Sequence, residues 1–283
     1  MKLPPFDYAA PATLGEAVRL LAANPGAKAL AGGQSLIPAL AFRLGAPPLL
    51  VDLRKLDELT GISIGADGVR LGARVRWRDI EDDERLRAAH PLLVAAVKHV
   101  AHYQVRNRGT VGGSLAHADP AAELPGVAVA CDARIVVTGP HGSRTIAAGD
   151  FFTGALSTAL ADDELIVELQ LPAWPRERRW AFEEFARRRG DFALAGVASY
   201  YDVGAHGEAY DAHIAVIGAC QRPHRVPAAE ALLNGRRLDA EAVARAVRAF
   251  EAALEPPGDL HASAAYRRAL AGTLLERALM RTL

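Results

Sequence analysis

Cysteine is scarce in this chain, which has only Cys131 and Cys220 among its 283 residues. The two are far apart and form no Cys-x-x-Cys pair, which argues against an iron–sulfur cluster or a structural zinc site within the chain. So few cysteines are typical of proteins from a reducing compartment, and we expect a cytoplasmic protein.

Excess charge and long apolar runs are also lacking. Lysine plus arginine equals aspartate plus glutamate at 33 each, so no net positive field favours nucleic acid or an anionic membrane. No segment offers the roughly 20 uninterrupted apolar residues of a membrane-spanning helix, and the N-terminus has no apolar signal region. We therefore expect neither secretion nor a membrane span, and a small-molecule ligand.

The composition that remains is that of a globular protein with two or three packed units, since 51% of residues are hydrophobic and 23% charged. Residues 1–56 are predicted to form a small α/β unit. Its helices are expected at 14–23 and 36–42, and its buried strands at 27–30 and 49–53. This order places a glycine-rich turn at the carboxyl end of a strand, where an anion can bind.

Two α+β units are predicted after it, over residues 57–175 and 178–283. The first has expected strands at 62–66, 69–73, 133–137, 143–146 and 165–171, and helices at 84–100 and 121–130. The second has three expected antiparallel strands at 180–186, 197–203 and 213–218, and helices at 239–254 and 263–283.

Two glycine-rich segments give the best indication of function, Ala31-Gly32-Gly33-Gln34-Ser35-Leu36 and Thr110-Val111-Gly112-Gly113-Ser114. Glycine permits positive φ and close approach, so we interpret both as loops whose backbone N–H groups converge on an anion, a diphosphate being the natural occupant. Neither segment fits G-x-G-x-x-G with a following acidic residue or G-x-x-x-x-G-K-[ST]. A Rossmann site and a P-loop are therefore both disfavoured.

Over its whole length the chain resembles the FAD-binding medium subunits of molybdenum hydroxylases, the group of aerobic carbon monoxide dehydrogenase and xanthine dehydrogenase. The resemblance rests on four ordered motifs: Ala31-Gly32-Gly33-Gln34-Ser35-Leu36-Ile37-Pro38, Gln104-Val105-Arg106-Asn107-Arg108-Gly109-Thr110-Val111-Gly112-Gly113-Ser114, Ala118-Asp119-Pro120-Ala121 and Arg187-Arg188-Arg189-Gly190-Asp191-Phe192-Ala193.

The resemblance implies an α+β fold. A two-part FAD-binding domain of the vanillyl-alcohol-oxidase type would occupy residues 1–56 and 57–175, followed by the smaller C-terminal domain of these flavoproteins over 178–283. It further implies non-covalent FAD that accepts electrons from iron–sulfur clusters on a partner and passes them to oxygen, a quinone or NAD. The partners would be a small iron–sulfur subunit and a large molybdopterin subunit, in a dimer of heterotrimers.

The same resemblance implies the site. Its cofactor-binding residues would be Ala31, Gly32, Gly33, Gln34, Ser35, Leu36, Thr110, Gly112, Gly113, Ser114, Ala118, Glu123, Leu165, Ile166 and Asp191. Of these, Glu123 would occupy the position of the acidic residue that lies beside the adenosine of FAD in relatives. Leu165 or Ile166 would lie near the flavin, and Asp191 would lie toward its isoalloxazine side. Ser114 and Glu123 replace the asparagine and aspartate common in relatives. We expect FAD binding to survive, because serine still donates and glutamate still accepts.

Other readings stay open. A stand-alone FAD-dependent reductase or oxidase, or a non-catalytic assembly protein, would share these motifs. His99 and His102 are expected on one helix face without a metal, and His117 either near the flavin or in an ordinary loop. Arg187, Arg188 and Arg189 either clamp a phosphate, are solvated, or pair with nearby acids such as Glu183 and Glu184.

Overall fold

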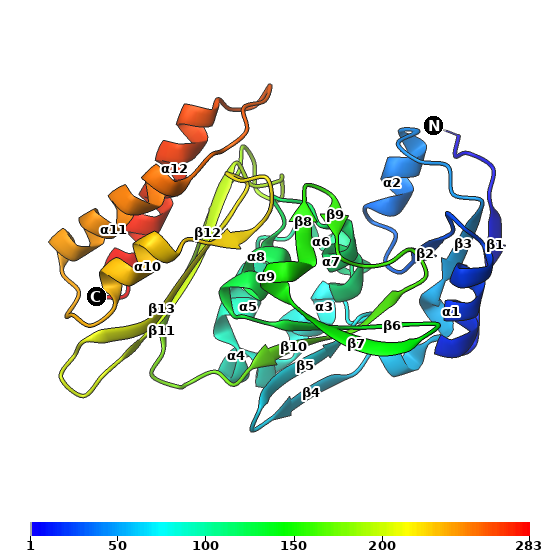
Figure 1. The fold of residues 1–283 in the computed structure, drawn as a ribbon, viewed down its shortest axis with the longest axis horizontal. Coiled ribbons are helices and arrows are strands. Elements are labelled where there is room, and N and C mark those ends of the chain that lie inside the picture. The colour runs from blue at the N-terminus through cyan, green and yellow to red at the C-terminus, as the bar shows by residue number, and fades with distance from the viewer. Residues whose placement is uncertain (1) are drawn as a thin grey trace.

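The computed structural model describes residues 2–283, and its three main sheets follow one another along the chain (Figure 1). The first is a small parallel sheet in the order β1-β3-β2, with a helix in each connection, as predicted for this part of the chain. Its elements are β1 (Asp7–Ala9), α1 (Leu14–Ala23), β2 (Lys28–Leu30), α2 (Leu36–Ala41) and β3 (Leu49–Asp52).

The second sheet is antiparallel, in the order β4-β5-β10-β6-β7. The alternation of apolar and polar residues explains why β5 forms a strand with one buried face: Val69 and Leu71 are buried, while Arg70 between them is exposed. The strands are β4 (Ile62–Gly65), β5 (Gly68–Gly72), β6 (Arg134–Gly139), β7 (Gly142–Ala147) and β10 (Leu165–Pro172), and between β7 and β10 lie α9 (Ala148–Phe151), β8 (Phe152–Gly154) and β9 (Ser157–Thr158).

Short helices fill the segment between β5 and β6. They are α3 (Trp77–Asp82), α4 (Glu84–Ala89), α5 (Pro91–Val97), α6 (Tyr103–Arg106), α7 (Val111–His117) and α8 (Glu123–Ala130). The single helix expected at 84–100 is therefore two. His90 separates them because Pro91 starts a new helix without an N–H to donate, and Nδ1 of His90 caps it by accepting from the Leu93 N–H at 3.3 Å. His99 and His102 follow α5 and are not on one helix.

The C-terminal part contains the three expected antiparallel strands and a short fourth one, in the order β11-β12-β13-β14. Its strands are β11 (Arg179–Phe185), β12 (Ala195–Val203), β13 (Ala209–Ile217) and β14 (His224–Arg225), followed by the helices α10 (Pro227–Leu233), α11 (Ala240–Ala253) and α12 (Ala264–Met280). Asp239 and Ser263 cap α11 and α12 with their side chains, which fixes where these helices begin.

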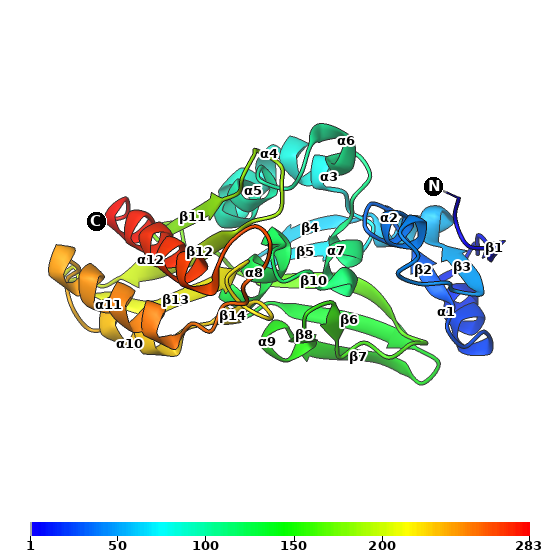
Figure 2. The ribbon, with the colours of Figure 1, turned by 90° about the horizontal axis from the view of Figure 1, so that it is seen from above.

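This C-terminal sheet is packed on both faces, with α10 and α12 on one side and with α5 and α8 of the preceding part on the other (Figure 2). Alternate residues of β12 enter different cores: Val197 and Tyr201 join the C-terminal helices, while Ala198 and Tyr200 join the main core. Gly126 allows the close approach of α8, because a Cβ there would lie 2.5 Å from Cγ2 of Ile217. No helix within residues 2–283 meets the length and hydrophobicity of a bilayer span.

An arginine joins the two parts at the connecting segment. Arg178 packs against the rings of Trp174 and Tyr200, which themselves meet edge to face, with its guanidinium carbon 5.0 and 4.1 Å from their centroids. It donates two hydrogen bonds of 2.8 Å to Asp202. A paired, largely buried arginine stacked on two aromatic rings holds a defined geometry. The C-terminal part is thereby fixed against the rest of the chain.

Replacing Phe250 tests the C-terminal core. Its side chain is fully buried in α11, so Phe250→Ala is expected to lower the free energy of unfolding by about 3–5 kcal/mol, measured by urea denaturation. Leu260 is fully exposed, and Leu260→Ala serves as the control, with a change of less than about 0.5 kcal/mol. Equal effects of the two substitutions would contradict this packing.

Candidate cofactor site

The first glycine-rich segment forms the turn from β2 into α2. Gly33 has φ of +72°, in the left-handed region that glycine adopts without strain. Within residues 2–283, the backbone N–H groups of residues 32–35 donate to no protein acceptor, and the hydroxyl of Ser35 makes no capping bond. Gln34 folds back, with Nε2 donating to the Gly32 carbonyl at 3.1 Å. Consecutive free N–H groups beside a hydroxyl are suited to an anion.

The second glycine-rich segment is the first turn of α7 and not the expected loop. The N–H groups of residues 111–114 are paired: Gly112, for example, donates to the Ala73 carbonyl at 2.8 Å, and Gly113 to Oγ1 of Thr110 at 3.2 Å. Neither glycine has positive φ. The glycine at 112 instead serves close packing, because a Cβ there would lie 2.7 Å from Cβ of Ala73. A run of consecutive free N–H groups is therefore found in the first segment and not in the second.

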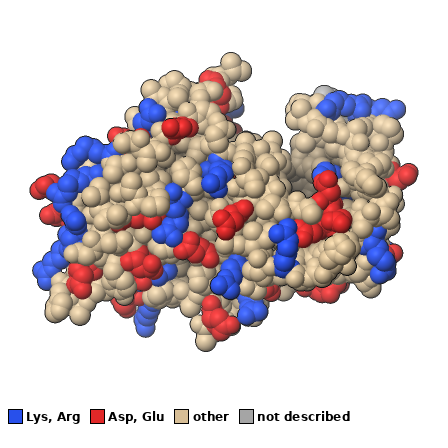
Figure 3. Space-filling view, in the orientation of Figure 1, with Lys and Arg blue, Asp and Glu red and all other residues tan. Residues whose placement is uncertain are grey.

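The two segments meet, although about 80 residues separate them. A Cβ on Gly32 would lie 2.2 Å from the carbonyl oxygen of Arg108 and 2.9 Å from Cα of Gly109, and one on Gly113 would lie 4.0 Å from Cβ of Ala31. The contact joins the turn before α2 to the start of α7. Figure 3 shows a notch in the molecular surface between the lobe of residues 1–56 and the main body.

The other implied residues are spread over a wider area. Ala118 ends α7 with φ of +51° and is buried, and Leu165 and Ile166 are buried at the start of β10. Asp191 is exposed, in a turn where a Cβ on Gly190 would lie 2.4 Å from Nδ1 of His102. The turn that contains Asp191 adjoins the beginning of α6, whereas the second glycine-rich segment comes after the end of α6. The structure thus brings the glycine-rich segments 31–36 and 110–114 together, and places the turn of Asp191 against His102.

Glu123 begins α8, and burial raises the pKa of its carboxyl to about 7, with the charge of Asp119 adding to the shift. A second, half-buried carboxyl, Glu184 on β11, is near enough to feel the charge of Glu123. Burial, together with the charge of Glu123, raises the pKa of Glu184 to about 9, and its Oε2 is buried without a hydrogen-bond partner. Sequence reasoning missed this pair, because only the packing of α8 on the C-terminal sheet brings the two residues together.

Regarding the alternatives for the arginine run, all three arginines are exposed, and pairing with Glu183 or Glu184 is not found within residues 2–283. Glu183 forms its ion pair with Arg281, and Glu184 forms none. Arg187 contacts His261 instead, with Nη1 3.1 Å from Nδ1. Only packing between distant segments produces these contacts, so proximity in sequence was a poor guide.

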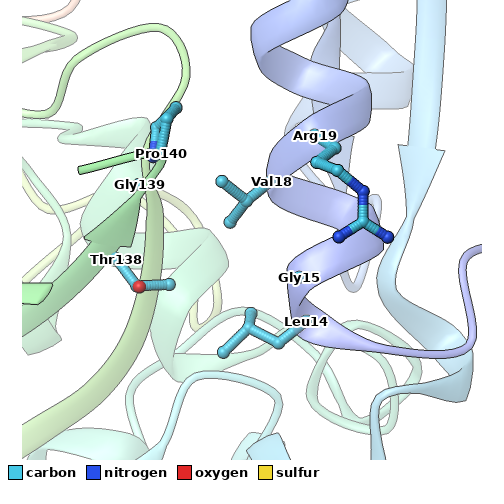
Figure 4. A pocket seen from close by; sticks show the side chains of 7 residues that line it. All are labelled: Leu14, Gly15, Val18, Arg19, Thr138, Gly139 and Pro140. Carbon is cyan, nitrogen blue, oxygen red and sulfur yellow. The ribbon is translucent and has the colours of Figure 1, made fainter. Parts of the chain in front are cut away.

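Two further features give no support for a cofactor site. His99 lies edge-on to Phe182 with centroids 5.2 Å apart, burial lowers its pKa, and residues 2–283 contain no group of three or more side chains able to hold a metal. A pocket of about 310 Å³ between α1 and the β6–β7 turn has one arginine, Arg19, and no acid (Figure 4). None of the implied cofactor-binding residues lines it.

Comparison with known proteins decides the family. Residues 4–174 match the family model described as the FAD binding domain in molybdopterin dehydrogenase, and residues 180–282 match the CO dehydrogenase flavoprotein C-terminal domain. The chain belongs to the FAD-binding medium subunits of molybdenum hydroxylases. The fold expected from the sequence, an FAD-binding domain followed by a flavoprotein C-terminal domain, is thereby confirmed.

Relatives of this family match along nearly the whole chain. The nicotine 6-hydroxylase medium subunit of Paenarthrobacter nicotinovorans is 41% identical over 99% of this chain and 98% of its own length. The carbon monoxide dehydrogenase medium chain of Hydrogenophaga pseudoflava is 38% identical over 98% and 96%. A solved structure of that organism's carbon monoxide dehydrogenase superposes with a TM-score of 0.96 over 100% of this chain and 98% of the other, at 39% identity.

Enlarging Gly32 tests the contact between the two segments. Gly32→Ala must push the turn away from the Arg108 carbonyl, so the free energy of unfolding is expected to fall by about 1–3 kcal/mol in urea denaturation. Gly61→Ala is the matched control, because a Cβ there meets nothing within 4 Å. If both variants unfold at the same urea concentration, the two segments are not in contact.

The buried carboxyl of Glu184 predicts a pH dependence of stability. Between its ordinary pKa of 4.5 and about 9, the folded chain keeps the proton and the unfolded chain loses it. Stability contributed by the protonated acid is therefore lost as pH rises through this window. Glu184→Gln carries no such proton, so its stability should not fall in this window. The free energy of unfolding of Glu184→Gln, relative to that of the wild type, is therefore expected to increase from pH 5 to pH 9. Denaturation at several pH values measures this, and a constant difference would refute it.

Proposed function

We propose that this chain binds FAD non-covalently as the medium subunit of a molybdenum-containing hydroxylase or dehydrogenase. Electrons from iron–sulfur clusters on a partner subunit pass through FAD to an external acceptor, while the substrate is transformed at the molybdopterin of another subunit. The observation that supports this most strongly is the turn of residues 32–35, with its free N–H groups, held against the start of α7.

The donors present fit the diphosphate of FAD. The free N–H groups of residues 32–35 and the hydroxyl of Ser35 would bind its oxygens, and no positive side chain is needed for such binding. Thr110 already accepts from Gly113, so its role is to hold the first turn of α7 in place. When bound, FAD supplies the redox chemistry, which protein side chains lack.

The remaining implied residues are proposed to surround the rest of the cofactor. Glu123 would accept from the adenosine part, and its pKa of about 7 makes this acceptor partly protonated at neutral pH. Leu165 and Ile166 would exclude water near the flavin, and Asp191 would lie toward the isoalloxazine side. The resemblance to relatives supports these roles, together with Ala31, Leu36, Gly112, Ser114 and Ala118.

The proposed assembly is a dimer of heterotrimers with a small iron–sulfur subunit and a large molybdopterin subunit, in the cytoplasm. The medium-chain relatives support the assignment of the iron–sulfur clusters and the molybdopterin to partner subunits. The two cysteines of this chain, which are buried and far apart in the sequence, support it as well. Within the chain we propose FAD-binding subdomains at 1–56 and 57–175 and a C-terminal domain at 178–283.

Two outcomes would favour the alternative functions. Reduction of an electron acceptor by the isolated chain would favour a stand-alone flavoenzyme, and failure of the whole complex to bind FAD would favour an assembly protein.

Gly33→Ala tests the proposed cradle against a control with the same kind of backbone strain. Gly33 has φ of +72° in the turn, and Gly142 has φ of +107° in the β6–β7 hairpin, with open space around it. Each alanine strains its turn by about 1–2 kcal/mol. Only Gly33→Ala is expected to weaken FAD binding, by at least about tenfold, or about 1.4 kcal/mol.

Quenching of flavin fluorescence on titration measures both dissociation constants. The chain with its partner subunits is used if the isolated chain does not retain FAD. Equal weakening by the two substitutions would show that the effect is general destabilisation, and unchanged binding in Gly33→Ala would place the diphosphate elsewhere.

A further inference from the structure

A second pocket lies where the FAD-binding and C-terminal parts meet. It has a volume of about 480 Å³ and is lined by the segment after α5 on one side and by the end of β11 with the following turn on the other. Figure 2 shows α5 beside β11. The polar lining consists of Lys98, His99, Glu184, Arg188 and Arg189. Its volume falls within the range of about 300–1,000 Å³ that is usual for small-molecule sites.

The pocket's cations have no counter-ions. Within residues 2–283, none of Lys98, Arg188 and Arg189 forms an ion pair. By contrast Arg106, close by in α6, is paired with Glu81 at 2.9 Å. Clustered positive charges that line a concave surface raise the local concentration of anions, and the planar guanidinium matches phosphate oxygens in geometry.

The acid in the pocket does not neutralise these cations. Glu184 lines the pocket, and the raised pKa of its carboxyl, about 9, keeps the proton at neutral pH. Its Oε2 is shielded from solvent and has no hydrogen-bond partner within residues 2–283, so the other oxygen, Oε1, faces the pocket. It therefore offers an O–H donor. His99 is kept neutral because burial lowers its pKa. The lining consequently combines three positive charges with a neutral donor.

We propose that this pocket binds a small phosphorylated molecule. Lys98, Arg188 and Arg189 hold the phosphate, and Glu184 donates a hydrogen bond to it or to a neighbouring oxygen. The site is separate from the FAD diphosphate cradle, since it uses none of residues 31–36 or 110–114. A ligand bound there touches both the segment after α5 and the C-terminal sheet, so it would tie the two parts of the chain together.

Calorimetric titration with inorganic pyrophosphate and with ribose 5-phosphate tests the proposal. The protein is first saturated with FAD, so that the glycine-rich site is filled and the titration reports other sites. We expect a dissociation constant of about 1 mM or tighter, and at least about tenfold weakening in the double variant Arg188→Gln, Arg189→Gln. Arg19→Gln is the matched control, because Arg19 lines the pocket of Figure 4 as its single cation, and it should change binding less than about twofold.

Two variants separate the role of Glu184 from its charge. Glu184→Gln keeps a neutral donor and should bind as the wild type does, whereas Glu184→Ala should bind more weakly. Circular dichroism and FAD content show that each variant is folded. The proposal is overturned if neither probe binds at about 10 mM or if the double arginine variant binds as the wild type does. It is also overturned if Arg19→Gln loses as much affinity as the double arginine variant. Loss of binding in Glu184→Gln would overturn the donor role.

Discussion

The contact of Gly32 with the backbone of Arg108 and Gly109 is the constraint on which the site depends. It places the turn of one unit against the first turn of α7 in the next. Residues 109–112 are themselves held by the strand-like segment 73–77: Trp77 donates to the Gly109 carbonyl at 3.2 Å and Val111 to the Val75 carbonyl at 2.9 Å. A rigid platform of paired backbone therefore faces a turn whose own N–H groups are free. The asymmetry explains why one segment can bind an anion while the other supports it.

The C-terminal part reaches this region through α8. Gly126 lets that helix lie directly on β13, and the same packing brings Glu184 of β11 beside Glu123 at the helix start. Arg178, packed against the rings of Trp174 and Tyr200, fixes the connecting segment. Two carboxyls with raised pKa values next to a cofactor domain cost stability, and such costs are common at functional sites. The C-terminal domain is thus part of the environment of the proposed cofactor.

Local patterns predicted most of the fold. The hairpin expected at 62–66 and 69–73 is β4 and β5, because strict alternation is a strong local signal. Its turn is formed by Ala66 and Asp67 and not by the expected Asp67-Gly68, so β4 ends and β5 begins one residue earlier than predicted. The break at His90 was missed since the apolar pattern continues through it. Glycine pairs suggested a loop at 110–114, but the Thr110 cap and close packing on Ala73 outweigh glycine's low helix propensity.

The site was predicted only in part. The glycine-rich segments could be found because their composition is unusual, and the four motifs gave the family. Their contact with one another, the pairing of Glu183 with Arg281 and the neighbourhood of Glu123 and Glu184 depend on the packing of distant elements. No periodicity or spacing in the sequence contains that information.

The measurement that tests the central claim most directly is an experimental structure of the chain, with its partner subunits, loaded with FAD. The account predicts the diphosphate within hydrogen-bonding distance of the backbone N–H groups of residues 32–35, between that turn and the start of α7. A diphosphate bound elsewhere, with those N–H groups still free, would contradict it.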